Sequence, residues 1–396
     1  MNLLVNKTFQ KMYVLQLLGA VSSTIFTFIL PLVLYEFTKS ALAMSTMRMV
    51  DFLPNVLLGM LIGVYVDRLN RKLLMVYANI ARVIGGVLFV YLLTMTDFAL
   101  WHLYVLGFVL SSFSYAIGNA SNAILTQLFD KSLMTDIQAK FSLIYTFTSI
   151  IGPALLGALL LWVSYEVFLW GYVACLACSA IVTLMLERVP TPERLVKQSI
   201  YHDLKEGVTS LFGNRAIFIP TWTIFLSNFA SSLCIGVLTF YALDILEFTK
   251  EQLGLMFALS AFGGIVGAKV IKPLRAKWRR GAIYTYVPLL DMLAFLLFFF
   301  AGSWLTLGIL LAIRTALSTV TNIIFLAIRQ ETTPNHLLGR VAGTSSMFMK
   351  LALPVGLFIG GIWADSLPVA PIFLLCAIIV SVNFFILYRN NFHEIS

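Results

Sequence analysis

Twelve long apolar stretches follow one another along the chain, separated by short polar segments. They lie at about 12–34, 41–66, 73–94, 99–128, 138–162, 165–186, 216–242, 252–273, 282–302, 303–328, 340–364 and 367–388. A helix of about 20 apolar residues crosses the hydrocarbon core of a bilayer. In lipid, a helix is also the only open-chain structure that satisfies its own backbone hydrogen bonds. The pattern therefore predicts an all-α integral membrane protein with twelve transmembrane helices.

The composition excludes a water-soluble protein. Of the 396 residues, 60% are hydrophobic and 11% are charged, whereas soluble domains average about 45–50% apolar and about 25% charged residues. The net charge of +9 does not indicate a nucleic-acid partner, because the basic residues are spread over short loops and form no single patch.

The distribution of basic residues predicts the orientation in the membrane. With the N-terminus inside, 21 Lys and Arg residues fall on the cytoplasmic side, and only Lys39 and Lys250 fall on the outer side. Cytoplasmic loops of membrane proteins carry this excess of Lys and Arg. We expect a multi-pass protein of the cell membrane with both termini in the cytoplasm.

The longest polar segment divides the chain into two halves. We expect an N-terminal six-helix half over 1–188, a cytoplasmic linker over 189–215 and a C-terminal six-helix half over 216–396. In the linker, Leu204, Val208 and Leu211 lie at helical spacing opposite Asp203 and Lys205. This spacing predicts an amphipathic helix on the inner membrane surface.

Short internal repeats relate the two halves. The chain repeats Ser-Asn-Ala-Ile at 121–124 as Thr-Asn-Ile-Ile at 321–324, Ile-Gly-Pro at 151–153 as Ala-Leu-Pro at 352–354, and the polar loop 67–72 as the basic loop 275–280. Matches at corresponding places in two halves are typical of parallel structural repeats in transporters. We therefore expect the two halves to be pseudo-symmetric.

A conspicuous motif lies between the second and third apolar stretches. It reads G-x-x-x-D-R-x-x-R-K and comprises Gly63, Asp67, Arg68, Arg71 and Lys72. It resembles the loop motif of the major facilitator superfamily, with Asn70 where the family usually has Gly. Asn also tolerates a positive φ. The resemblance implies that Asp67 holds an inter-helix charge pair that closes the cytoplasmic side during the transport cycle.

Other segments resemble one branch of that family, the bacterial macrolide-efflux and siderophore exporters. They are Phe-Leu-Pro at 52–54, Leu-Lys-Glu-Gly-Val at 204–208, Leu-Gly-Arg-Val at 338–341 and Pro-Val-Gly at 354–356. In the fifth apolar stretch, Gly152, Pro153 and Gly157 partly match the antiporter signature of the family, although Thr148 and Leu156 replace two of its glycines. The resemblance implies an export antiporter with the twelve-helix facilitator fold.

Six ionisable residues lie deep inside apolar stretches: Arg48, Asp51, Arg82, Asp291, Arg314 and Lys350. Each such residue costs about 2.5–3.5 kcal/mol or more at the centre of a membrane helix and is a candidate functional residue. Arg48 and Asp51 lie three residues apart and can pair on one helical face. A buried carboxylate beside an arginine can change its protonation when that pairing changes, so Asp51 with Arg48 is the candidate for proton coupling. The alternative to proton coupling is that Asp51 and Arg48 form a static salt bridge.

The helix order of the resembling family assigns the remaining charges. It implies that Arg314 and Lys350, together with Gln16, Asn119 and Asn122, face a substrate cavity, whereas Arg82 and Asp291 lie in outer helices and are structural. Arg48, Arg314 and Lys350 outnumber Asp51 among the cavity candidates, which favours an anionic or polar substrate.

We therefore expect a secondary active transporter that exports an amphipathic, drug-like or macrolide-like small molecule by alternating access, with protons as the coupling ion. The alternatives are export of a siderophore, another endogenous metabolite or a lipid, and a membrane sensor that transports nothing. The sequence holds no zinc-protease, dinucleotide-binding or Walker A motif, so we expect no enzyme, cofactor or metal site. We expect a monomer whose partners are its substrate, protons and membrane lipids.

Overall fold

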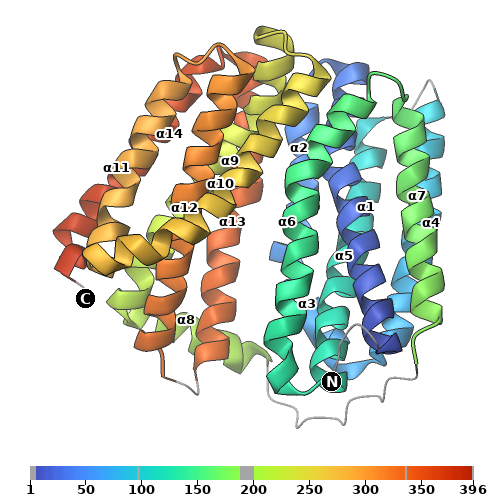
Figure 1. Cartoon of the computed structure of the whole chain (residues 1–396), viewed down its shortest axis with the longest axis horizontal. Coiled ribbons are helices and arrows are strands. Elements are labelled where there is room, and N and C mark those ends of the chain that lie inside the picture. The colour runs from blue at the N-terminus through green and yellow to red at the C-terminus, as the bar shows by residue number, and fades with distance from the viewer. Residues whose placement is uncertain (1–5, 96–98, 188–199, 335–336, 395–396) are drawn as a thin grey trace. The chain divides into compact units, whose positions relative to one another are not determined.

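The structure is a computed structural model that describes residues 6–95, 99–187, 200–334 and 337–394, apart from the side chains of residues 60, 67, 131, 200–204 and 338–339. The described chain is helical throughout (Figure 1). It divides into two compact units, one formed by Met1–Lys39 with Thr46–Leu195 and the other by Ser40–Ser45 with Val196–Ser396.

The first unit contains six long stretches of helix. They are α1 (Lys7–Thr38), α2 (Ala41–Leu57) continued by α3 (Gly59–Arg68), α4 (Arg71–Thr94), α5 (Leu100–Leu128), α6 (Met134–Leu159) and α7 (Tyr165–Leu184), with a 3-10 turn, η2 (Lys131–Leu133), before α6. In this unit, α1 packs against α6 and α7, and α4 packs against α5 and α7.

The second unit contains one short and six long helices. They are α8 (Ile200–Gly213), α9 (Arg215–Phe240), α10 (Lys250–Lys277), α11 (Arg280–Phe298), α12 (Trp304–Thr332), α13 (Leu338–Ser366) and α14 (Ala370–Arg389), with a π-helical turn, η3 (Tyr241–Ile245), after α9 and a 3-10 turn, η4 (Phe392–Glu394), after α14. Here α10 packs on α12, α9 on α13 and α14, and α11 on α14.

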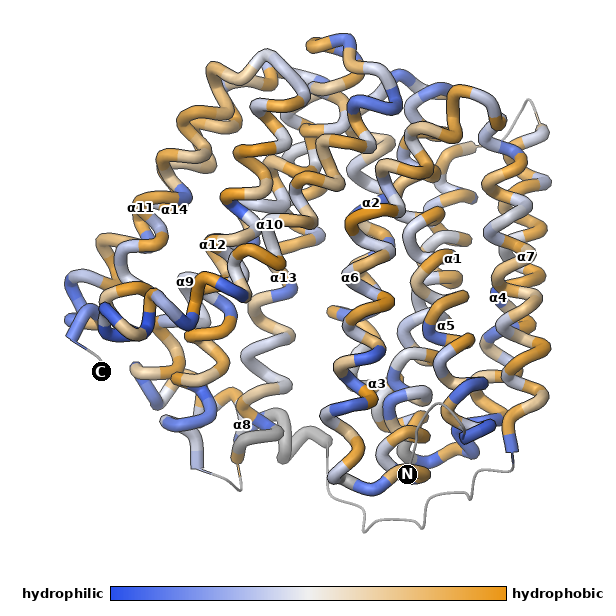
Figure 2. Tube along the Cα trace, viewed as in Figure 1, coloured by the Kyte–Doolittle hydropathy of each residue, from blue (hydrophilic) through white to orange (hydrophobic). Residues whose placement is uncertain are grey.

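Among the described residues, eleven helices are long and apolar enough to cross a membrane. Hydrophobic stretches run along most of the helices, and the loops and helix ends are more often hydrophilic (Figure 2). The remaining predicted stretch, the second along the chain at 41–66, does not form the single helix that its pattern indicates. It is divided at Leu58, four residues after Pro54, into α2 and α3.

Glycines allow α10 and α12 to approach backbone to backbone. A Cβ added at Gly263 would overlap the carbonyl oxygen of Ala312, and one added at Gly267 would lie 2.5 Å from the carbonyl oxygen of Ala316. Small residues spaced four apart give membrane helices this close packing. The sequence Gly-Gly-Ile-Val-Gly at 263–267 therefore fixes how these two helices cross.

Adjacent glycines in α10 provide a matched test of this packing. Gly263→Ala should destabilise the protein by about 1–3 kcal/mol, because the new methyl group forces the two backbones apart. Gly264→Ala should leave stability unchanged or raise it by up to about 1 kcal/mol, because alanine favours helix and its Cβ would meet no atom closer than 3.7 Å. Thermal unfolding midpoints of the two purified variants in detergent measure the difference. Equal midpoints would show that α10 and α12 do not meet at Gly263.

Candidate functional site

A buried charge cluster joins four helices of the first unit. Asp51 on α2 accepts a hydrogen bond of 2.8 Å from the hydroxyl of Ser111 on α5. Arg82 on α4 and Arg48 on α2 both attract the Asp51 carboxylate electrostatically, and Arg82 is the stronger of the two. Arg82 also interacts with the hydroxyl of Tyr172 on α7. The cluster carries two cations and one carboxylate.

The sequence analysis placed Asp51 and Arg48 together but treated Arg82 as a separate structural charge. The structure brings Arg82 to the same carboxylate, because α4 packs between α5 and α7 in this unit. The side chain of Arg82 is buried, and its Nε has no hydrogen-bond partner within the described residues. The sequence could not show this pairing, since residues 51 and 82 lie on different helices.

A second buried ion pair lies in the other unit. Arg314 on α12 donates a hydrogen bond of 2.8 Å from Nε to Asp291 on α11, and another of 2.8 Å from Nη2 to the hydroxyl of Ser231 on α9. The guanidinium also stacks over the ring of Phe295, with its central carbon 3.5 Å from the ring centroid. The two charged side chains are 7% and 14% exposed. Asp291, expected to be structural, thus compensates the charge of a predicted cavity residue.

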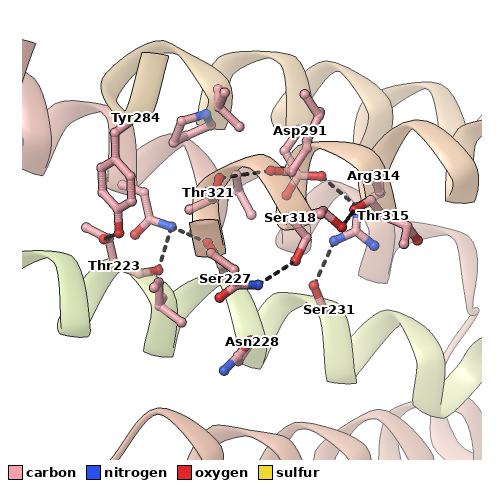
Figure 3. A pocket seen from close by; sticks show the side chains of 18 of the residues that line it. Thr223, Ser227, Asn228, Ser231, Tyr284, Asp291, Arg314, Thr315, Ser318 and Thr321 are labelled. Carbon is pink, nitrogen blue, oxygen red and sulfur yellow. Dashed lines mark hydrogen bonds and ion pairs between the residues drawn. The ribbon is translucent and has the colours of Figure 1, made fainter. Parts of the chain in front are cut away.

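These two charges border a polar pocket of about 250 Å³ inside the second unit (Figure 3). Helices α9, α10, α11, α12 and α14 all contribute to its wall. Its polar lining residues are Thr223, Ser227, Asn228, Ser231, Ser260, Tyr284, Asp291, Arg314, Thr315, Ser318, Thr319, Thr321, Asn322 and Asn383. So many hydroxyl and amide groups inside a membrane helix bundle form a site that can hold water or a polar ligand.

Hydrogen bonds between helices hold the pocket wall in place. Asn383 on α14 donates to the carbonyl of Thr223 at 3.0 Å and to the hydroxyl of Ser227 at 2.8 Å. Ser260 on α10 and Thr315 on α12 share a hydrogen bond of 3.1 Å. These residues were not predicted from the sequence, because they are uncharged. Polar residues recurring every four positions in the apolar stretch of α9 were the available signal.

The other predicted cavity residues do not line this pocket. Gln16, Asn119 and Asn122 belong to the first unit, where Asn119 donates to the carbonyl of Tyr115 on its own helix at 2.8 Å. Lys350 lies on α13, where its side chain is exposed. Within the second unit, Arg314 is paired with Asp291.

The basic motif links the ends of three helices in the first unit. Arg71 donates to the side chain of Gln127 at 2.7 Å, near the end of α5. Lys72 and Lys11 donate to the carbonyls of Leu186 and Met185, just beyond α7, at 2.5 and 2.7 Å. Cations at a helix C-terminus satisfy its unpaired carbonyls and complement its dipole. Arg71 and Lys72 thus tie α4 to its neighbours.

The motif segment holds four other residues of interest, Gly63, Asp67, Arg68 and Asn70. The side chain of Asp67 lies outside the described residues, and Arg68 is exposed. A Cβ added at Gly63 would meet no atom within 4 Å, so no close helix contact depends on this glycine. Asn70 has a φ of −64° and caps α4 by accepting from the N–H of Leu73. Asn70 therefore caps α4 and does not use the positive φ that asparagine tolerates.

The antiporter-like segment lies at a close helix contact. The helix α6 continues through Pro153. A Cβ added at Gly152 would lie 2.5 Å from Cγ2 of Thr24 on α1, and Gly157 is buried. Gly152 therefore allows α1 and α6 to pack tightly.

No group of three or more His, Cys, Asp or Glu residues within the described chain could hold a metal ion.

The comparison with known proteins agrees with this architecture. A family model described as Major Facilitator Superfamily matches residues 12–357. Among curated proteins, macrolide efflux protein A of Streptococcus pyogenes is 22% identical over 385 residues, which cover 92% of this chain and 91% of that protein. The putative bacilysin exporter BacE of Bacillus subtilis is 25% identical over 343 residues, covering 83% of each chain.

Solved structures show the same fold. The nucleoside transporter NupG superposes with a TM-score of 0.73 at 16% identity, covering 98% of this chain and 99% of that chain. A bacterial homologue of the iron transporter ferroportin superposes with a TM-score of 0.72 at 16% identity, covering 96% and 97%. The predicted all-helical facilitator fold and the resemblance to macrolide-efflux proteins are confirmed. Because the family model matches most of its length, this chain belongs to the Major Facilitator Superfamily of membrane transporters.

Proposed function

We propose that this secondary transporter exports an amphipathic small molecule by alternating access, in exchange for protons. The observation that carries the proposal is the similarity to macrolide efflux protein A over 92% of the chain. The putative bacilysin exporter is similar over 83% of the chain and favours a second candidate, the export of an endogenous metabolite. Both relatives are named for outward transport of small molecules.

The second unit supports an amphipathic substrate, because α9 carries both polar and aromatic surfaces. Thr223, Ser227 and Ser231 border the polar pocket. On the same turns of α9, the rings of Trp222 and Phe225 stack with their centroids 5.2 Å apart. The ring centroid of Phe225 also lies 5.0 Å from that of Phe348 on α13. Ligand sites combine a mostly apolar surface with a few polar groups that orient the ligand.

The orientation in the membrane is part of the proposal. The excess of Lys and Arg in alternate loops supports cytoplasmic termini and places the basic motif at the cytoplasmic surface. There, Asp67 would pair across helices and help close the cytoplasmic side, while Arg71 and Lys72 hold the ends of α5 and α7. We propose that the protein acts as a monomer in the cell membrane.

Transport into vesicles tests the proposed function. Inside-out vesicles that contain only the purified protein should accumulate a labelled macrolide when their lumen is acidic, because protons leaving the vesicle drive the exchange. An ionophore that collapses the pH gradient should remove the accumulation. Vesicles without protein are the control. Accumulation of a bacilysin-like dipeptide without macrolide would favour the second candidate, and gradient-independent uptake of either compound would contradict proton antiport.

We propose Asp51 as the group that carries the proton. It is the carboxylate of the buried cluster in the first unit, and it faces Arg82, Arg48 and the hydroxyl of Ser111. A conformational change that alters its contacts with either arginine changes the relative stability of its charged and neutral forms. The carboxylate can then load a proton in one conformation and release it in the other.

Asp51→Asn should abolish pH-driven export, because an amide cannot exchange a proton, whereas Ser111→Ala should retain it because the carboxylate remains. Flux in vesicles with and without a pH gradient measures both variants. The double variant Asp51→Asn with Arg82→Gln restores the charge balance of the cluster and separates loss of coupling from misfolding. Normal pH-driven flux in a folded Asp51→Asn protein would remove Asp51 from the mechanism.

A further inference from the structure

Two polar stripes face the pocket of the second unit, one on α9 and one on α12. The first consists of Thr223, Ser227 and Ser231 and the second of Arg314, Ser318 and Asn322, so each recurs every four residues. Residues four apart lie on the same face of a helix. Both helices therefore turn a continuous polar face toward one cavity, although most of their other residues are apolar.

Three serines in these stripes accept a hydrogen bond from a protein donor. Ser231 accepts from Arg314 at 2.8 Å, Ser227 from Asn383 at 2.8 Å and Ser318 from Asn322 at 3.4 Å. The direction of the first is fixed, because a guanidinium only donates. These bonds appear in Figure 3 as dashed lines around the pocket.

Each of these serines also has a hydroxyl proton that it can donate to a ligand. A hydroxyl holds one proton to donate as well as its acceptor lone pairs. Within the described chain, none of the three hydroxyls donates a hydrogen bond to another protein group. The pocket therefore presents three O–H groups that a ligand rich in acceptor oxygens can satisfy.

The charge of the pocket selects against ionised ligands. Asp291 and Arg314 are the only charged residues among the described residues of its lining, and their charges cancel in the 2.8 Å ion pair. A ligand carboxylate would face Asp291, and a ligand ammonium would face Arg314. The sequence favoured an anionic or polar substrate, but its anionic part rested on counting Arg314 without Asp291 and does not apply to this pocket.

We infer that this pocket binds an uncharged, polyoxygenated part of the substrate, such as a sugar ring or another group rich in hydroxyl and ether oxygens. The inference rests on the proposed function, because it assigns one part of the exported amphipathic molecule to a site. The serines on α9 and α12 bind its oxygens, and the neutral ion pair excludes charged analogues. A pocket of about 250 Å³ is large enough for such a group and not for a whole drug-sized molecule.

Three alkyl glycosides that differ only in charge test the inference. They are octyl β-glucoside, octyl β-glucuronide and octyl 6-amino-6-deoxy-β-glucoside, which share the tail and ring and are neutral, anionic and cationic. Calorimetric titration of the full-length protein in nanodiscs, corrected with empty nanodiscs, measures each Kd. The neutral glucoside should bind at least about tenfold more tightly than either charged analogue, because an unpaired ligand charge is costly in the pocket. Tighter binding of a charged analogue, or no binding of any of the three, would overturn the inference.

Serine variants locate the binding. Ser227→Ala, Ser231→Ala and Ser318→Ala should each weaken octyl β-glucoside binding about 3–10-fold, the effect of losing one neutral hydrogen bond. Ser381→Ala is the matched control, because Ser381 lies outside the pocket lining and its hydroxyl donates to its own helix at Ile378. Unchanged affinity in all three pocket variants would refute the assignment.

Macrolide flux in vesicles separates this inference from the proposed function. If the wild-type protein accumulates macrolide in response to the pH gradient while the glycosides show no pocket-dependent binding, the exporter remains and the site assignment fails. If the glycosides bind as expected but no proton-driven flux occurs, the site stands and the transport proposal fails.

Discussion

Hydrocarbon offers no hydrogen-bond partner, so each polar group that these helices bring into the membrane must find a partner inside the protein. The two buried charge clusters follow from this constraint. Asp51 meets Arg82 and Ser111 in one unit, and Arg314 meets Asp291 and Ser231 in the other. Each cluster joins several helices, because no single helix carries a complete set of partners. Groups that bind a substrate or a proton therefore also fix the helix packing.

The lipid environment also explains why glycines lie at close helix crossings. Between helices in lipid, packing and hydrogen bonds drive association, because the hydrophobic effect contributes little there. Gly263 and Gly267 bring α10 against the backbone of α12. On the same face of the bundle, Ser260 reaches Thr315 at 3.1 Å. The close crossing thus supports one wall of the polar pocket.

The sequence predicts the helices well, because a continuous apolar stretch of this length has one stable structure in a membrane. The basic motif was sufficient to identify the family, and the weak repeats predicted two related halves. Contacts between distant helices were not predictable. The pairing of Arg314 with Asp291, the approach of Arg82 to Asp51 and the three serine donors all depend on helix rotation. The division of α2 from α3 and the capping role of Asn70 were missed because each depends on local backbone geometry.

One pair of corresponding positions in the two units carries opposite charges. Arg71 begins α4 and Arg280 begins α11, and the residue eleven positions further is Arg82 in one and Asp291 in the other. The α11–α12 pair is consequently neutral, whereas Arg48, Arg82 and Asp51 together leave one positive charge. Moving a full charge across the membrane is worth about 2.3 kcal/mol per 100 mV. The membrane voltage therefore acts on any movement of the first cluster across the membrane, and not on movement of the neutral ion pair, even when the cargo is uncharged.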